Sequence, residues 1–309
     1  MIEIEIMVQQ HTVRKDFRFE GKGLHSGKVA TMTIKPAPVD YGIRFVRTDI
    51  SSDAVVEAIA GNVSNTARST TITKDGISVI TVEHVMSALT GMGIDNARIE
   101  IDNVEVPILD GSAKPYIDAI WKNGIVEQDA PRKYLELNET FEIKNDETGA
   151  YLRIEPADEP SYNLTIDFNS RILGVQDAHW DRSVTYAEEI GICRTFVFFH
   201  EIEFLFKNNL IKGGDVDNAI VIVEHPVTDD QLEHMSKLFN VPFLGISDEG
   251  YLNNLQLRFP NECARHKLLD LIGDLRLAGG FLKARITAYK SGHSINTRAA
   301  RELGTLLKK

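Results

Sequence analysis

The sequence predicts an α+β protein made of two similar halves, and three observations support this prediction. Runs of alternating apolar and polar residues separated by turn residues recur in both halves, which is typical of β-hairpins. Amphipathic stretches that favour helices follow such runs at 83–93 and 261–280. Each stretch contains a histidine, a glycine seven residues later and a following strand. If the halves face each other, His84 and His266 lie near their shared interface.

The first half, residues 1–130, is predicted to be one α+β domain. Residues 29–34 alternate as a strand does, and 70–82 has the pattern of a hairpin that turns at Asp75-Gly76. The elements expected next are a helix over 83–93, strands at 97–101 and 104–109, and a helix over 113–122. We place the domain boundary in the polar, proline-containing segment 127–133, because 309 residues suffice for two domains with their own cores.

The second half, residues 131–309, is predicted to be a second α+β domain. Its expected elements are strands at 141–145, 150–156 and 162–168, two helical stretches, a strand at 217–224, a helix within 226–242, a helix over 261–280, a strand over 281–290 and a last helix over 295–308. Thr228 and Gln231 have the spacing of a capping box. Asn261 is the expected N-cap of the long helix.

Composition excludes several classes of function. A formal net charge of −11 makes nucleic acid an unexpected partner, because such a chain gains nothing from counterion release. Two cysteines, Cys193 and Cys263, cannot build a disulfide framework or a cysteine-rich zinc module. The N-terminus lacks the features of a signal peptide, and no apolar run approaches the roughly 20 residues of a membrane span. We therefore expect a cytoplasmic protein without a transmembrane segment.

A metal site is indicated by two short patterns. His266 and Asp270 are four residues apart and share a face of the predicted helix, as the histidines of helical zinc motifs do. Glu83-His84 begins the other helix and would add a third ligand with a carboxylate beside it. A catalytic zinc site needs three protein ligands, an open position for water and a nearby proton acceptor. Either pattern alone is more typical of an ordinary helix face, so the prediction depends on the two helices meeting.

A cationic group is expected from a histidine after the last strand. His293 follows a glycine on what we predict to be a strand-end loop, from which an imidazolium could protonate a leaving amine or stabilise an oxyanion. Asp274, one turn beyond Asp270, could orient that ring. The alternative is a solvated loop histidine. Cys263, one turn before His266, is interpreted as a small buried hydrophobe rather than a ligand.

Seven ordered blocks of sequence resemble one known family. They are TVEHVMSALTGMGIDN, PILDGSA, TIDFN, CRTFVF, the glycine pair before DNAIV, RHKLLDLIGDL and AYKSGHSIN. In this order they are similar to the UDP-3-O-acyl-N-acetylglucosamine deacetylases, the LpxC family of lipid A biosynthesis. The resemblance runs from about residue 23 to residue 296. It implies two similar domains, each a mixed β-sheet packed with helices, in a layered sandwich with the active site between them.

The resemblance also implies a role for individual residues. The implied zinc ligands are His84, His266 and Asp270, a set that suits iron(II) as well. The implied catalytic residues are Glu83 as general base, His293 as cationic acid, Asp274 as its orienting partner and Thr195 as an oxyanion donor. The implied substrate contacts are Lys267 with the uridine diphosphate, and Phe168, Asn169 and Phe196 along the nucleotide or acyl side.

The implied reaction is zinc-dependent removal of the N-acetyl group of UDP-3-O-(3-hydroxyacyl)-N-acetylglucosamine, releasing acetate in the committed step of lipid A biosynthesis. An insert at about 185–225 would form an acyl-chain passage. A further insertion at about 224–257 resembles the version of the enzyme that is fused to a hydroxyacyl-carrier-protein dehydratase. Without that fusion we expect a monomer, and the acylated product could draw it transiently to the inner membrane surface.

Two other functions remain open at this point. The same residues could serve another zinc amidase, such as a peptidase or a different sugar deacetylase. A non-catalytic metal-binding or ligand-binding protein is the second alternative, and it would leave Glu83 and His293 without a role. Lys267 and the phenylalanine-rich insert favour an acylated nucleotide sugar.

Overall fold

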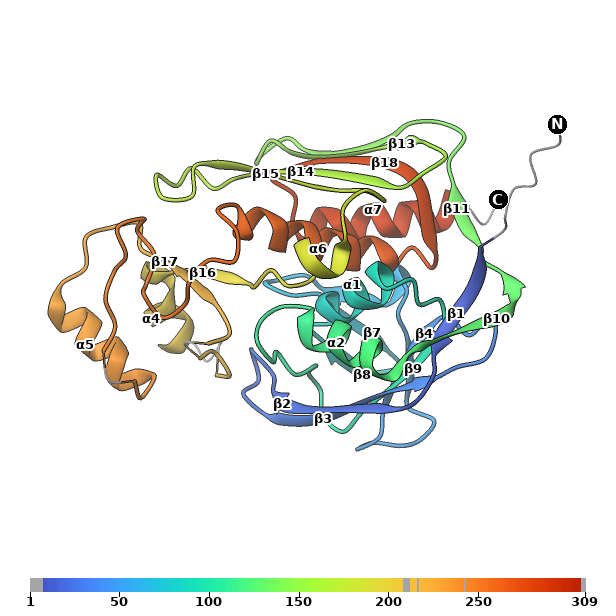
Figure 1. Ribbon diagram of the computed structural model, residues 1–309, viewed down its shortest axis with the longest axis horizontal. Coiled ribbons are helices and arrows are strands. Elements are labelled where there is room, and N and C mark those ends of the chain that lie inside the picture. Colours follow the sequence, from blue (N-terminus) through green and yellow to red (C-terminus); the bar gives the residue numbers. More distant parts are fainter. Residues whose placement is uncertain (1–7, 208–211, 216, 242, 307–309) are drawn as a thin grey trace.

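Two mixed β-sheets form the outer layers of the protein, and helices fill the space between them (Figure 1). The computed structural model describes residues 8–207, 212–215, 217–241 and 243–306. One sheet is built from the first half of the chain and the other from the second half, so the layers run sheet, helices, helices, sheet (Figure 1). This arrangement confirms the predicted α+β layered sandwich.

The first sheet contains five strands. Across the sheet they are β2 (Phe17–Lys22), β3 (Val29–Pro36), β9 (Ala97–Ile101), β4 (Ile43–Arg47) and β5 (Val55–Glu57). Only the central pair β9–β4 is parallel, and the other neighbours are antiparallel. In β3 buried residues alternate with less buried ones, as expected for a strand with one face on a core.

The second sheet repeats this plan. Across it the strands are β12 (Phe141–Asn145), β13 (Ala150–Pro156), β18 (Phe281–Tyr289), β14 (Ser161–Asp167) and β15 (Val175–Trp180). Among these five strands only the central pair, β18–β14, is parallel. A short sixth strand, β11 (Tyr134–Glu136), pairs with β18. The same strand order and the same strand directions in both sheets confirm that the two halves are structural repeats.

The inner layers are formed by equivalent helices of the two halves. The first half supplies α1 (Glu83–Gly91) and α2 (Lys114–Asn123), and the second supplies α6 (Glu262–Arg276) and α7 (His293–Leu306). Helix α6 is central, and only Arg265 and Lys267 of its residues are not buried. Helix α1 packs closely against it at Gly273, where a Cβ would lie 2.1 Å from the backbone oxygen of Glu83. A glycine is therefore required for this approach of the two halves.

Each half carries an insertion before its first inner helix. It follows β5 in the first half and β15 in the second half. In the first half the insertion contains η1 (Ala60–Asn62), β6 (Val63–Asn65), β7 (Thr71–Lys74) and β8 (Ile77–Ile80). In the second half it contains α3 (Tyr186–Glu189), β16 (Phe196–Phe198), α4 (Phe199–Lys207), β17 (Ile220–Ile222) and α5 (Asp229–Leu238). Elements β16 to α5 form a lobe beside the sandwich, with a small core of its own (Figure 1). The predicted capping box of Thr228 and Gln231 is present at the start of α5.

One sequence prediction about a strand is corrected, and one segment forms a strand that was not predicted. The segment 104–109 is not a strand, and only Glu105 forms an isolated bridge, with Ile80. Pro107 has no N–H to donate to a sheet, and the buried Glu105 carboxylate instead accepts the backbone N–H groups of His25 and Ser26. The segment 127–133, predicted as a polar boundary, lies largely in β10 (Ile125–Pro131), which pairs with β1 (Gln9–Val13). The division into two domains at residue 130 stays a prediction.

None of the helices in the described part of the chain is both long and apolar enough to span a bilayer.

Candidate active site

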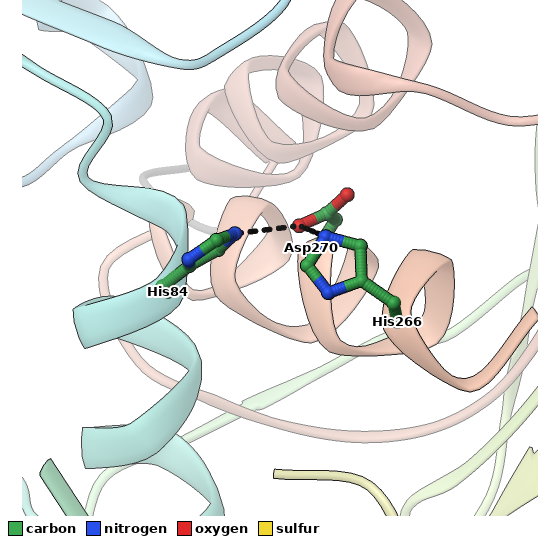
Figure 2. Close-up of side chains that lie close together, drawn as sticks. All are labelled: His84, His266 and Asp270. Carbon is green, nitrogen blue, oxygen red and sulfur yellow. Dashed lines mark ion pairs between the residues drawn. The ribbon is translucent and has the colours of Figure 1, made fainter. Parts of the chain in front are cut away.

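Three potential metal ligands converge where α1 meets α6. His84 is the second residue of α1, and His266 and Asp270 are one turn apart on α6, as their spacing predicted. Figure 2 shows the two imidazoles directed at the same carboxylate, and Asp270 Oδ1 lies 3.6 Å from His84 Nε2 and 3.5 Å from His266 Nε2. Each side chain offers a ligand atom within 4.8 Å of the others. In the described ranges no other group of three His, Cys, Asp or Glu side chains does so.

The hydrogen bonds around these side chains leave the atoms that face one another free for a cation. His266 Nδ1 bonds the backbone oxygen of Cys193 at 3.0 Å, which places the ring proton there and a lone pair on Nε2. Burial lowers the pKa of His266 to about 4, so the ring is neutral. Asp270 Oδ2 accepts from Lys267 Nζ at 2.9 Å, whereas the buried Oδ1 has no hydrogen-bond partner among the described residues. An orphaned carboxylate oxygen between imidazole nitrogens fits a divalent cation such as zinc.

Asp270 is suited to ligation in its charge state as well. Burial raises the pKa of its carboxyl group, but positive charge beside it, including the Lys267 ammonium, outweighs burial and holds that pKa well below its usual value. The carboxylate is therefore ionised, as a metal ligand must be.

Glu83 lies beside this group as the first residue of α1. Its side chain is buried, and Oε2 accepts the backbone N–H of Thr70 at 3.0 Å. Burial raises the pKa of Glu83, although the neighbouring histidines oppose the shift. A carboxylate that is easier to protonate than usual, next to three potential metal ligands, has the properties of a general base.

His293 and Asp274 are paired, as the sequence predicted. His293 Nδ1 lies 2.9 Å from Asp274 Oδ2, and His293 Nε2 lies 4.0 Å from Asp270 Oδ2. Burial disfavours the imidazolium, but the Asp274 carboxylate outweighs it and raises the pKa of His293 to about 9. The ring is therefore a cation at neutral pH and points toward the metal ligands.

The prediction that His293 lies on a loop is wrong, because His293 is the first residue of α7. The helix begins early because the backbone N–H of Asn296 bonds the Gly292 carbonyl at 3.0 Å, which closes the first turn around His293. The imidazole is consequently held by a helix as well as by Asp274.

Two polar residues of the site were missed by sequence reasoning. Thr70 donates its hydroxyl to Asp274 Oδ1 at 2.6 Å and its backbone N–H to Glu83, so it connects the carboxylates of these two residues. Asn296 donates to Asp274 Oδ2 at 3.0 Å. Thr70 lies in a run of threonines with no distinctive spacing. Asn296 is three residues after His293, a signal that is visible only once the helix is known to include His293.

The predicted oxyanion and acyl-side residues lie where the lobe joins the sandwich. Thr195 precedes β16; its backbone N–H donates to Gly111, and its carbonyl accepts from Ile220. Thr195 and Phe196 line a mainly apolar pocket that continues into the lobe along Val197, Ile202, Leu205 and Val221. The three potential metal ligands are not among its lining residues, so the pocket lies next to the site rather than in it.

The remaining predicted substrate contacts are spread around this region. Phe168 packs its ring against Phe196 with 5.5 Å between centroids and is 45% exposed. Asn169 is exposed in the turn after β14, with a φ of 54°. Lys267 bonds Asp270 and lies 5.8 Å from the Phe196 ring centre, so in this structure its charge serves the ligand carboxylate. Its contact with a phosphate stays a prediction.

Comparisons with known proteins give a consistent result. A family model described as LpxC, UDP-3-O-acyl N-acetylglycosamine deacetylase, matches residues 10–238 and 242–305. Bifunctional LpxC/FabZ enzymes of Porphyromonas gingivalis and Bacteroides thetaiotaomicron are 43% and 40% identical over 96% of the chain, which spans 64% of their length. A UDP-3-O-acyl-N-acetylglucosamine deacetylase of Saccharophagus degradans is 40% identical over 96% of the chain and 90% of that relative.

Proposed function

The chain belongs to the UDP-3-O-acyl-N-acetylglucosamine deacetylase family, and on this premise we propose that it hydrolyses the N-acetyl group of UDP-3-O-(3-hydroxyacyl)-N-acetylglucosamine in a metal-dependent reaction. The observation that carries the proposal is the orphaned Oδ1 of Asp270 between the Nε2 atoms of His84 and His266, with Glu83 adjacent. The products would be acetate and the free amine, and the step would be the committed one of lipid A biosynthesis in the cytoplasm.

The metal would be held by His84, His266 and Asp270, and zinc is our first choice with iron(II) as the alternative. When bound, it would supply Lewis-acid activation of a water molecule and of the amide carbonyl. Lys267 keeps the second oxygen of Asp270 occupied and so directs the first toward the cation.

Two proton transfers would be assigned to residues on either side of this centre. Glu83 would accept the proton of the attacking water, a role that its raised pKa favours. His293 would give a proton to the departing amine nitrogen, and Asp274, held by Thr70 and Asn296, would keep the imidazole cationic and oriented. The Thr195 hydroxyl would donate to the oxygen that becomes negative during the attack.

Substrate recognition would follow from the two surfaces next to the site. The apolar pocket behind Thr195 and Phe196 has the lining expected for the acyl chain. Lys267 would contact the diphosphate, and Phe168 and Asn169 would line the nucleotide or acyl side. Because most of the residues that line the pocket belong to the insert at about 185–225, we propose that this insert confers selectivity for the acylated sugar.

Acetate release from the acylated nucleotide sugar tests this proposal directly. The purified chain should release acetate, lose the activity after chelation and recover it with added zinc or iron(II). UDP-N-acetylglucosamine without the acyl group is the matched control and should react much more slowly. Chelator-sensitive release from N-acetylated peptides or other sugars alone would favour the alternative amidases. Stoichiometric metal without any hydrolysis would favour the non-catalytic alternative.

A further inference from the structure

We propose that the buried ion pair between Arg194 and Glu262 is a positioning device for the metal centre, because it holds the peptide group whose carbonyl orients His266. The inference rests on the metal site proposed above. The peptide group in question joins Cys193 to Arg194. Its carbonyl oxygen accepts from His266 Nδ1 at 3.0 Å, and its N–H donates to Glu262 Oε1 at 3.0 Å.

The two partners of this peptide group lie on the same face of α6. Glu262 and His266 are four residues apart and therefore occupy successive turns of the helix. A peptide group is planar, with its N–H and carbonyl pointing in opposite directions. Fixing the N–H on Glu262 therefore fixes the direction of the carbonyl, and the carbonyl in turn determines which nitrogen of His266 carries the proton.

Both carboxylate oxygens of Glu262 accept two hydrogen bonds each. Glu262 is fully buried, and its Oε1 also accepts Arg194 Nε at 2.8 Å. Its Oε2 accepts Arg194 Nη2 at 3.0 Å and the backbone N–H of Arg258 at 2.6 Å. Arg194, which is 5% exposed, gives a further bond from Nη2 to the Gln256 carbonyl. A bidentate Arg–carboxylate pair of this kind fixes the relative orientation of the two side chains as well as pairing their charges.

The same pair also affects Thr195, the residue after Arg194. Thr195 has its backbone N–H bonded to Gly111 of the first half. The segment 193–195 thus runs between α6 and the first half of the chain. The Cys193 carbonyl that accepts from His266 lies at one end, and the proposed oxyanion donor Thr195 lies at the other. Loss of the ion pair should disturb both metal binding and turnover.

A purely structural role makes a different prediction. Buried ion pairs contribute to stability in variable amounts, and their removal lowers stability wherever they lie. A second pair of the same type provides a matched control: Asp95 accepts two bonds from Arg132, at 2.9 and 2.8 Å, and one from the backbone N–H of His11. This pair is also largely buried, but none of its bonds reaches a proposed ligand.

The test compares Glu262→Gln with Asp95→Asn in the full chain. Zinc affinity is measured by competition with a chromophoric chelator, and coordination is followed by the visible absorption of the Co²⁺-loaded protein. Glu262→Gln should weaken zinc binding about 10- to 100-fold, the usual effect of losing an outer partner of a metal ligand, and should alter the Co²⁺ spectrum. It should also lower kcat more than it raises KM. Asp95→Asn should lower the melting temperature and leave zinc affinity and the spectrum unchanged.

Several outcomes would overturn the inference. Equal zinc affinities and spectra for wild type and Glu262→Gln would show that the pair is only structural. An equal loss of zinc affinity in Glu262→Gln and Asp95→Asn would show the same. If Glu262→Gln does not fold, Arg194→Lys, which keeps the charge and the backbone N–H but loses the planar fork, is judged by the same criterion. A wild-type protein that binds no zinc or iron(II) would refute the metal site itself. If the wild type is active and Glu262→Gln has the same zinc affinity, Co²⁺ spectrum and kcat, only the positioning role is refuted.

Discussion

Gly273 provides a sharp test of how the two halves of the protein assemble the site. A Cβ at this position would lie 2.1 Å from the backbone oxygen of Glu83, 3.0 Å from its carbonyl carbon and 3.1 Å from the backbone nitrogen of Ser87. All three atoms belong to the backbone of α1, so no side chain can rotate away. Ordinary contact begins at 3.4 Å, and Gly273→Ala therefore forces the helices about 1.3 Å apart at this point.

The expected cost can be estimated from two opposing effects. Overpacking typically costs about 1–3 kcal/mol, and a collision with backbone belongs at the upper end of that range. Replacing glycine by alanine inside a helix otherwise stabilises by about 1 kcal/mol. The net expectation is a loss of about 2 kcal/mol, or roughly 3 °C in melting temperature for a chain of this length. His84 lies on the displaced helix, and metal sites tolerate about 0.2 Å, so we also expect zinc affinity to fall by at least about tenfold.

Melting temperature and zinc affinity of Gly273→Ala are measured beside those of Gly304→Ala. Gly304 lies in α7, and its added Cβ would only come within 3.4 Å of the Ala278 carbonyl oxygen, which is ordinary contact. Gly304→Ala should be neutral or slightly stabilising. A Gly273→Ala protein as stable as wild type, with unchanged zinc affinity, would show that α1 and α6 do not depend on this close approach.

Four further predictions follow from the site. Glu83→Ala should retain the metal, but its kcat should fall about 10²- to 10⁴-fold. Full turnover in the variant would remove the general-base role. Asp270→Ala should abolish stoichiometric metal binding, which elemental analysis of the purified variant checks. His293→Ala should lower kcat with little change in KM, and a pure KM effect in steady-state kinetics would contradict its role as acid. Burial raises the pKa of Cys263 to about 12 and also raises that of Cys193, so at pH 8 both thiols stay protonated and should react with Ellman's reagent only after denaturation.

Local spacing predicted a large part of the candidate site. His266 and Asp270 share a helix face because they are four residues apart, and Asp274 follows one turn later. The repeated pattern of histidine and glycine indicated two similar halves, which the two sheets bear out, since five strands of each follow the same order. The hairpin at Asp75-Gly76 and the capping box at Thr228 likewise depend on neighbours within a few residues.

Contacts between distant segments could not be read in this way. The strand expected at 104–109 is reduced to an isolated bridge of Glu105 with Ile80, because Pro107 has no N–H to extend the pairing. The Glu105 carboxylate bonds the backbone at residues 25 and 26, a contact that no local spacing indicates. Strands β1 and β10 pair across more than a hundred residues of sequence. Thr70 reaches Asp274 across the interface between the halves, and no spacing near Thr70 indicates that contact.

The sequence by itself determined which residues share a helix face, where the capping box of α5 forms, and that the chain has two related α+β halves. These features depend on the periods of helices and strands, which are local properties of the chain. Only the tertiary structure decided that α1 meets α6, that the Cys193 carbonyl orients His266, and that Asp270 keeps one oxygen without a hydrogen bond. Those features depend on how closely two helices approach, and that distance is set by packing between halves rather than by any neighbour in sequence.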